Sequence, residues 1–229
     1  MTRMDELKRA LSVNAAVYEA VRTYIRPGVS ERDIYELTKA VVDKMLYDVP
    51  HDFIGDFVGG KRCGHIGGDP TEYRLSAGDG LILDLSVRCG NTWSDTCRTF
   101  FLGEPSDEVQ KAYSAVLTLQ AFGVSMVHPG IRAEEIKTKS EQLLASLGYG
   151  GRMPHHMGHA IGSAPFMPPV FDTGCADTVA VGDFFTLEPG IYIPNAWGLR
   201  VENDYLLHSD GAELLFDYPT ELSYFTIGE

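Results

Sequence analysis

Two stretches of the chain decide the fold: residues 81–101, LILDLSVRCGNTWSDTCRTFF, and residues 184–206, FFTLEPGIYIPNAWGLRVENDYL. Each places apolar and β-branched residues on both sides of a turn-forming sequence, which predicts a β-hairpin. In the first stretch, a tight turn at residues 89–90 would place Asp84 directly opposite Asp95. Like charges directly opposite each other destabilise a sheet, so this pair needs an explanation.

The second stretch carries a second pair of acids. A loop centred on Asn195 would place Glu188 opposite Glu202. Two pairs of acids in apolar strands indicate a cation between them, because unpaired buried charges are costly. His159 lies between the two stretches and adds an imidazole. The direct interpretation is an oxygen-rich metal site with one histidine.

An internal repeat supports this interpretation independently. The string Pro-Gly-Val at residues 27–29 recurs as Pro-Gly-Ile at residues 129–131, an offset of 102 residues, and each copy is followed by an acid-Ile pair. A Gly-Asp pair precedes Asp84 and another precedes Glu188, at an offset of 104 residues. Two copies are too few for a solenoid. Two halves related by a pseudo-two-fold axis would bring the four acids together at the seam.

Hydrophobic periodicity and capping residues predict helix pairs beside antiparallel strands, which is typical of an α+β fold. The expected helices are residues 5–25, 30–46, 106–127 and 132–147. The expected strands are residues 81–88, 92–102, 184–193 and 198–207, with weaker ones near 51–59 and 158–161. The proline-stiffened stretch 163–173 is expected to be irregular and to line a pocket.

Several motifs occur in a characteristic order: Asp84-Leu85-Ser86, Ser94-Asp95-Thr96, His155-His156-Met157-Gly158-His159, Glu188-Pro189-Gly190-Ile191-Tyr192 and Leu199-Arg200-Val201-Glu202. Together they resemble the pita-bread metallopeptidases, which include methionine aminopeptidase, aminopeptidase P, prolidase and creatinase-like enzymes. The sequences of these motifs most resemble those of the Xaa-Pro aminopeptidase and prolidase branch. The resemblance implies one pita-bread catalytic domain over residues 1–229, with halves of about 1–103 and 104–229 and no N-terminal prolidase-type domain.

The resemblance also implies the roles of individual residues. Two divalent ions (Mn²⁺, Co²⁺, Zn²⁺ or Fe²⁺) with a bridging hydroxide would be held by Asp84, Asp95, His159, Glu188 and Glu202. Glu188 would also carry a proton from the nucleophile to the leaving amine. Arg200 and Tyr192 would orient a ligand carboxylate. His65 and His155 resemble histidines that contact the substrate, whereas His156 is expected to be a packing or exposed residue.

One position departs from the family pattern. The peptidases carry a second histidine seven residues after the ligand histidine, and this chain has Phe166 there. Loss of a donor that steadies the tetrahedral intermediate costs on the order of 10²-fold in rate. Either His65 or His155 supplies the donor, or the substrate differs.

Composition narrows the class of protein. The net charge of −13 argues against binding to nucleic acid or to an anionic membrane surface. The four cysteines have neither metal-ligand nor disulfide-framework spacing, so a cytoplasmic location is expected. The expected partner is a short peptide or small amide substrate, with a homodimer as one option.

Three functions remain open. The leading hypothesis is a dinuclear Xaa-Pro peptidase acting on a short peptide or peptide-like amide. The second is a creatinase-like enzyme that acts on a small non-peptide amide or amidine, which Phe166 favours. A methionine aminopeptidase is a weaker alternative, because the motifs around Glu188 and Glu202 resemble the prolidase branch more closely. A non-catalytic binding module is also weaker, because all five ligand positions are filled.

Overall fold

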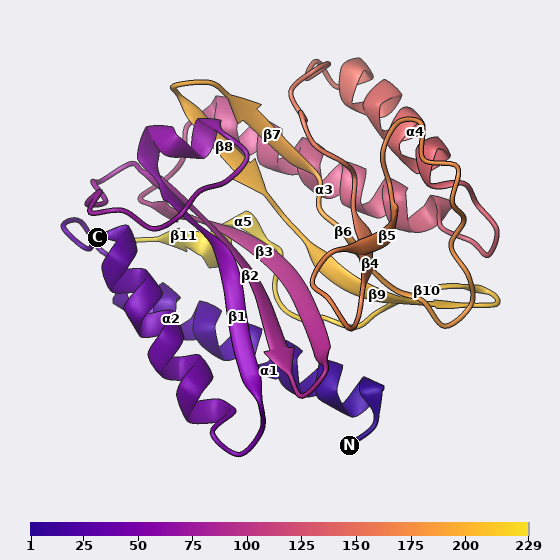
Figure 1. Cartoon of the computed structure of the whole chain (residues 1–229). Coiled ribbons are helices and arrows are strands. Elements are labelled where there is room, and N and C mark those ends of the chain that lie inside the picture. Colours follow the sequence, from indigo (N-terminus) through magenta and orange to yellow (C-terminus); the bar gives the residue numbers. More distant parts are fainter. Residues whose placement is uncertain (229) are drawn as a thin grey trace.

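The computed structural model describes residues 1–228 of the chain. Four long helices flank the strands, with α1 and α2 on one side and α3 and α4 on the other (Figure 1). The helices are α1 (Arg3–Tyr24), α2 (Glu31–Met45), the 3-10 helix η1 (Gly60–Gly64), α3 (Asp107–Met126), α4 (Ala133–Ser146) and α5 (Leu222–Phe225). This arrangement confirms the expected α+β class, with helix pairs beside strands that are almost all antiparallel.

The strands form three sheets. The first has the order β1 (His51–Gly59), β2 (Gly80–Cys89), β3 (Thr92–Leu102) and β11 (Thr226–Ile227). The second has the order β10 (Gly211–Leu214), β9 (Asn203–His208), β6 (Phe184–Leu187), β4 (His159–Ile161) and β5 (Met167–Val170). The third pairs β7 (Gly190–Ile193) with β8 (Trp197–Arg200). Only the pairing of β11 with β3 is parallel among the described strands.

Local chemistry explains where the long helices begin. The side chains of Thr2 and Ser30 accept hydrogen bonds from the third residue of α1 and α2, and Asp5 and Asp33 return the bond. These capping boxes satisfy two amide groups that a helix start leaves unpaired. Ser106 caps α3 through its side chain. The predicted bounds of all four long helices are correct to within two residues.

The sequence repeat reappears as a repeated set of hydrogen bonds. The amide of Gly28 donates to the carbonyl of Leu75 at 2.8 Å, and the amide of Gly130 donates to the carbonyl of Val179 at 2.8 Å. Both glycines have a positive φ, which glycine adopts without strain. Each half also buries its own apolar cluster, one beneath α1 and α2 and one beneath α3 and α4.

The register of the first hairpin differs from the prediction. Cys89 pairs with Thr92, so the two-residue turn lies at Gly90-Asn91, one residue later than expected. A turn shifted by one residue shifts the register by two, and Asp84 therefore lies opposite Cys97 rather than Asp95. Asp84 and Asp95 still share one face, because successive side chains alternate between the two faces of a strand.

The register of the second hairpin agrees with the prediction. Ile193 pairs with Trp197 across a loop centred on Asn195, whose φ of 62° is left-handed. Pro189 interrupts the expected continuous strand, so β6 and β7 are separate elements. Leu187 pairs with Asn203 on one side of the break, and Gly190 pairs with Arg200 on the other. The same register on both sides places Glu188 and Glu202 at facing positions.

Some elements were not expected from the sequence. Strand β5 lies inside the stretch that was predicted to be irregular, and it pairs with β4. Strands β10 and β11 and the short helices η1 and α5 were also missed. Within residues 1–228, no helix combines the length and the apolar character that crossing a membrane requires.

Candidate metal centre

The five residues expected to bind metal come from five places in the chain and converge at the seam between the two halves. Asp84 lies on β2, Asp95 on β3 and His159 at the start of β4. Glu188 follows β6, and Glu202 precedes β9. The seam itself is closed by a reciprocal pair of backbone hydrogen bonds, in which the amides of Cys97 and Glu202 each donate to the other residue's carbonyl at 3.3 and 3.1 Å.

His159 is the centre of this cluster. Its Nε2 lies 3.6 Å from Asp95 Oδ2 and 3.4 Å from Glu188 Oε1. Its Nδ1 lies 3.0 Å from the carbonyl oxygen of Ala160, which indicates that Nδ1 carries the proton. That tautomer leaves the lone pair of Nε2 directed at the acids, as in histidines that bind metals. Asp95, His159 and Glu202 offer ligand atoms within 4.8 Å of one another.

Burial makes the negative charge of this cluster expensive. Burial and the neighbouring acids raise the pKa of Asp95 and of Glu202 well above the usual range of a carboxyl group. Burial also raises the pKa of Asp84 to about 6, although the Arg200 guanidinium opposes that change. A divalent cation would stabilise the ionised carboxylates, because opposite charge lowers a carboxyl pKa.

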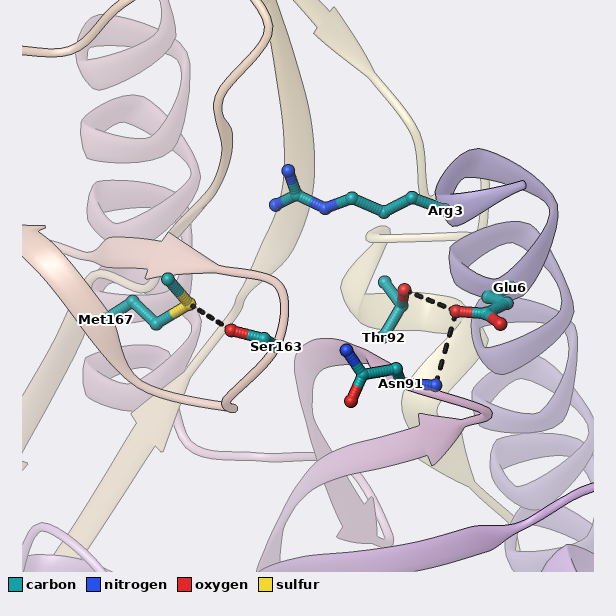
Figure 2. Close-up of a pocket in the computed structure, with 6 residues that line it drawn as sticks. All are labelled: Arg3, Glu6, Asn91, Thr92, Ser163 and Met167. Carbon is teal, nitrogen blue, oxygen red and sulfur yellow. Dashed lines mark hydrogen bonds between the residues drawn. The ribbon is translucent and has the colours of Figure 1, made fainter. Parts of the chain in front are cut away.

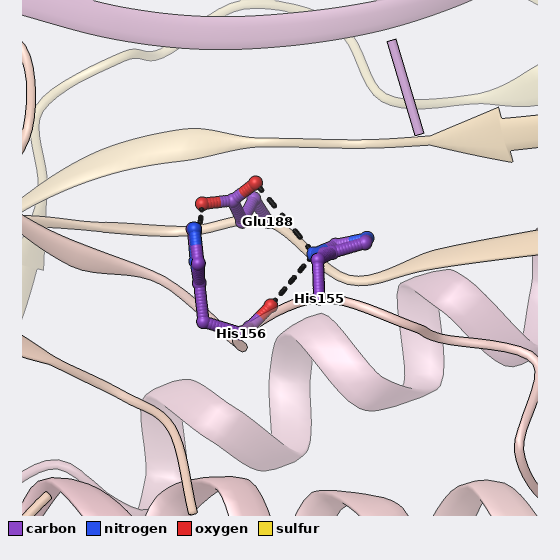
Figure 3. A group of neighbouring side chains, drawn as sticks. All are labelled: His155, His156 and Glu188. Atoms are coloured by element: carbon purple, nitrogen blue, oxygen red, sulfur yellow. Dashed lines mark hydrogen bonds and ion pairs between the residues drawn. The ribbon is translucent and has the colours of Figure 1, made fainter. Parts of the chain in front are cut away.

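Glu188 lies among three histidines. Figure 3 shows the imidazoles of His155 and His156 on either side of its carboxylate, and these three residues also form a candidate metal-binding group. Burial alone would raise the pKa of Glu188, but His156, His155 and His159 together hold that pKa at about 2. Burial lowers the pKa of His155 to about 4, so its ring is neutral at pH 7.

His156 corrects one expectation from the sequence. It is half-buried rather than a plain packing or exposed residue, and its Nδ1 lies 3.0 Å from Glu188 Oε1. This contact is close enough for an ion pair, and neither atom has another hydrogen-bond partner among the described residues. No spacing in the sequence distinguishes His156 from its neighbour, because the contact depends on how the turn before β4 folds.

Arg200 and Tyr192 lie behind Asp84. One terminal nitrogen of Arg200 lies 2.7 Å from Asp84 Oδ2 and 2.8 Å from Asp56 Oδ2. The other terminal nitrogen donates to the hydroxyl of Tyr192 at 3.2 Å. Asp56 was not expected from the sequence, and neither was Asp204, whose Oδ2 accepts a hydrogen bond from the backbone amide of Asp95 at 3.0 Å.

The donor set fits a metal ion. Glu188 Oε1 and Glu202 Oε2 are buried and have no hydrogen-bond partner within residues 1–228. Buried polar atoms without a partner are rare in proteins and call for an explanation such as a bound ion. Carboxylate oxygens and one imidazole are the ligands that divalent first-row metals bind in hydrolases. The residues present therefore match a metal centre.

Tyr192, which accepts a hydrogen bond from Arg200 behind Asp84, also lines a cavity. A cavity of about 480 Å³ is lined by His65, Arg152 and Tyr192, together with the glycines around His65. His65 is exposed at its rim. Phe166 lies on the other side of the acids, where its ring centroid is 4.5 Å from that of His159 and 5.2 Å from that of His156. With 51% of its surface exposed, Phe166 presents an apolar face beside the cluster.

A second hollow lies away from the acids. This cavity has a volume of about 300 Å³ and lies between α1, the turn of the first hairpin and residues 163–167. Figure 2 shows the six residues that line it. Its charged residues are already paired: Arg3 donates to the carbonyl of Ile161 at 3.0 Å, and Glu6 accepts from Thr92 Oγ1 at 2.7 Å. It therefore lacks the free acids and imidazoles that mark the metal centre.

Comparison with known proteins agrees with this site. The sequence pattern described as metallopeptidase family M24 matches residues 5–209. The chain belongs to metallopeptidase family M24. Membership confirms the resemblance to pita-bread metallopeptidases and with it the class of enzyme and fold. Enzymes of a metallopeptidase family depend on metal, which agrees with the donor set; the number and kind of ions are a separate question.

This M24 chain has relatives among dipeptidases. A probable dipeptidase PepE of Mycobacterium tuberculosis is 29% identical over 227 residues, which cover 96% of this chain and 59% of the relative. An Xaa-Pro dipeptidase from Bacillus anthracis superposes with a TM-score of 0.90 at 30% identity, over 96% of this chain and 62% of that one. An X-Pro aminopeptidase from Thermotoga maritima gives a TM-score of 0.90 at 25% identity, over 99% and 63%. The chain thus spans about three-fifths of the length of these relatives.

Proposed function

We propose that this chain is the catalytic part of a dinuclear metal-dependent hydrolase of the Xaa-Pro dipeptidase type, which cleaves a short peptide or a peptide-like amide. The observation that carries the proposal is the buried convergence of three carboxylates, those of Asp95, Glu188 and Glu202, on His159, in which Glu188 and Glu202 each keep an oxygen without a hydrogen-bond partner. The likeness to Xaa-Pro dipeptidases supports the substrate class.

Five residues would hold the ions: Asp84, Asp95, His159, Glu188 and Glu202. Their oxygen and imidazole donors suit Mn²⁺, Co²⁺, Zn²⁺ or Fe²⁺. When bound, two such ions would make a water molecule nucleophilic at neutral pH and polarise the scissile carbonyl group. Arg200 holds Asp84 from behind at 2.7 Å, which keeps that carboxylate directed into the cluster.

Glu188 is the proton carrier in this proposal. Its low pKa, near 2, keeps the carboxylate ionised at neutral pH, so it can accept a proton from the attacking water. It would then pass that proton to the nitrogen of the leaving amine. His155 and His156 touch Glu188 and limit its motion. His155 Nε2 is buried and has no hydrogen-bond partner in the described part of the chain, so its hydrogen-bonding capacity is unused.

Phe166 favours a second candidate function. It lies against His159, where the family's peptidases have a histidine, and its ring cannot donate a hydrogen bond to a developing oxyanion. A creatinase-like enzyme for a small amide or amidine would not need the same donor. If the chain is a dipeptidase, the hydrogen-bond donor to the oxyanion comes instead from His155 or from His65, which lines the cavity.

Hydrolysis of defined substrates tests the proposal. The protein is stripped with a chelator, reconstituted with Mn²⁺, Co²⁺ or Zn²⁺, and assayed on Ala-Pro, Leu-Pro, Ala-Leu and creatine. We expect cleavage of the two Xaa-Pro dipeptides, loss of activity with the chelator and recovery with metal. Glu188→Gln is a matched control, because it removes the proton acceptor while changing the size of the side chain little.

The two candidate functions give different results in this assay. Cleavage of creatine without cleavage of either Xaa-Pro dipeptide would replace the dipeptidase proposal with the creatinase-like one. Activity that survives both complete metal removal and Glu188→Gln would refute the proposed site, since neither the ions nor Glu188 could then be needed.

A further inference from the structure

Two acids face each other across the first sheet, but they are not the pair that the sequence suggested. Asp56 on β1 lies directly opposite Asp84 on β2. Directly opposed like charges destabilise neighbouring strands. Here the guanidinium of Arg200 lies between them, with one terminal nitrogen 2.8 Å from Asp56 Oδ2 and 2.7 Å from Asp84 Oδ2. Arg200 is therefore the cation that this acid pair requires.

The same two side chains also fasten a loop. Asp56 Oδ1 accepts a hydrogen bond from the amide of Gly68 at 2.9 Å. The second terminal nitrogen of Arg200 donates to the carbonyl of Ile66 at 2.8 Å. Gly67, between these two anchors, approaches Asp56 so closely that an added Cβ would lie 2.2 Å from Oδ2. The backbone of residues 66–68 is thus held on both sides by the Asp56–Arg200 pair.

This loop lines the cavity of about 480 Å³, which would receive the substrate in the proposed function. His65, Ile66 and Gly67 line it together with Arg152 and Tyr192. Tyr192 also accepts a hydrogen bond from Arg200. A single guanidinium therefore contacts Asp84, the loop and Tyr192. A side chain that fixes Arg200 would therefore fix the width of the cavity at the same time as the position of Asp84.

We propose that Asp56 is a positioning residue that sets the cavity wall formed by residues 65–68 through its contacts with Arg200 and Gly68. It touches neither the substrate nor the reacting atoms. Its charge keeps Arg200 between the two acids, and its second oxygen holds the loop. The proposal rests on the dipeptidase function for its effect on substrate binding, whereas its effect on the loop is independent of any substrate.

Hydrogen exchange of the loop tests the structural part. Asp56→Asn keeps the shape of the side chain and removes its charge, and Asp69→Asn makes the same change at an exposed position of the same loop. The oxygen of asparagine can still accept from the Gly68 amide, but without the charge that strengthens the bond, and this weakening should speed exchange of that amide by roughly tenfold. We expect this acceleration in Asp56→Asn and wild-type exchange in Asp69→Asn. Equal exchange in wild type and Asp56→Asn would overturn the proposal, provided that circular dichroism shows both to be folded.

Kinetics on Ala-Pro test the functional part. A loosened wall removes binding energy that is common to ground state and transition state, so KM should rise by about tenfold while kcat stays within about threefold. A fall in kcat with an unchanged KM would contradict the proposal and assign Asp56 to the chemistry instead. If wild type does not cleave Xaa-Pro dipeptides at all, the proposed function fails, and the exchange experiment still decides the role of Asp56.

A second variant tests the same contact independently, in case Asp56→Asn does not fold. Gly67→Ala forces the Asp56 carboxylate away from the loop without altering its charge. It should accelerate exchange at Gly68 as Asp56→Asn does, and the double variant should be no worse than either single one, because both changes break the same contact. Additive effects in the double variant would refute the shared mechanism.

Discussion

Arg98 is fully buried and has no acidic partner within residues 1–228, yet it lies at the centre of the seam. It donates to the carbonyls of Glu202, Pro219 and Tyr218 at 2.7, 2.8 and 3.2 Å. It also donates to Asn203 Oδ1 at 2.8 Å and to its neighbour's carbonyl. Arg98→Met would keep the apolar stem and remove every one of these bonds.

The size of the effect follows from the acceptors left behind. The Glu202 carbonyl retains the amide of Cys97, but Asn203 Oδ1 and the carbonyls of Tyr218 and Pro219 lose the one donor that the described structure gives them. Each unsatisfied buried acceptor costs about 1–3 kcal/mol, so the three together could cost about 3–9 kcal/mol. Tyr218 and Pro219 are only half-buried and can bind water. Methionine also avoids the cost of burying a charge, which offsets part of this loss. We therefore expect the free energy of unfolding to fall by about 3 kcal/mol, at the lower end of the range.

Thermal unfolding followed by circular dichroism measures this loss. For a chain of this size, about 3 kcal/mol corresponds to a fall in Tm of roughly 6–12 °C. Arg26→Met is the matched control, since Arg26 is exposed and its removal should move Tm by about 2 °C or less. Arg98→Met should also weaken metal binding, because Arg98 holds the backbone carbonyl of Glu202, which is one of the expected metal ligands. A Tm within 2 °C of wild type for Arg98→Met would refute the reasoning.

Three further predictions concern the metal centre. Phe166→His should raise kcat on Ala-Pro by about tenfold or more if the missing donor limits turnover, and an unchanged kcat would show that another residue already supplies it. Glu202→Gln should bind fewer ions per chain than wild type after reconstitution, as measured by elemental analysis, and equal metal content would exclude Glu202 as a shared ligand. The metal-free protein should lose stability as pH rises through about 6. Burial raises the pKa of Asp84 to about 6 in the folded state and raises the pKa of Asp95 and of Glu202 well above the usual range, so the stability present at low pH is lost as these three groups ionise. The lowered pKa of His155 opposes part of this loss. Added Mn²⁺ should oppose this fall in Tm, and a metal-free Tm that rises between pH 5 and pH 7 would contradict the assignment.

The sequence predicted those features that depend on local chemistry. Ser30 and Ser106 marked two helix starts correctly, because an N-cap acts within one turn. The second hairpin was placed in register because Asn195 occupies a left-handed position that few residues adopt. The first hairpin was misplaced because Gly90 can occupy either position of a two-residue turn, and only the packed structure selects one.

Features that depend on distant contacts were not predictable. His156 and Glu188 meet across 32 positions of sequence, and Asp56 and Arg200 across 144. Neither pair shares a motif or a repeat that would link its members. The four acids and the one histidine of the candidate site were predicted because the repeat doubles part of the pattern. Asp56, which occurs once, had no such second copy.

The pair of backbone bonds between Cys97 and Glu202 has a mechanical consequence. A hinge displaces atoms in proportion to their distance from its axis, and these bonds join the two halves beside the acids themselves. Rocking of one half against the other would therefore move the outer helices α2 and α4 far more than it would move Asp95 or Glu202. Such a motion would leave the spacing of the carboxylates almost constant.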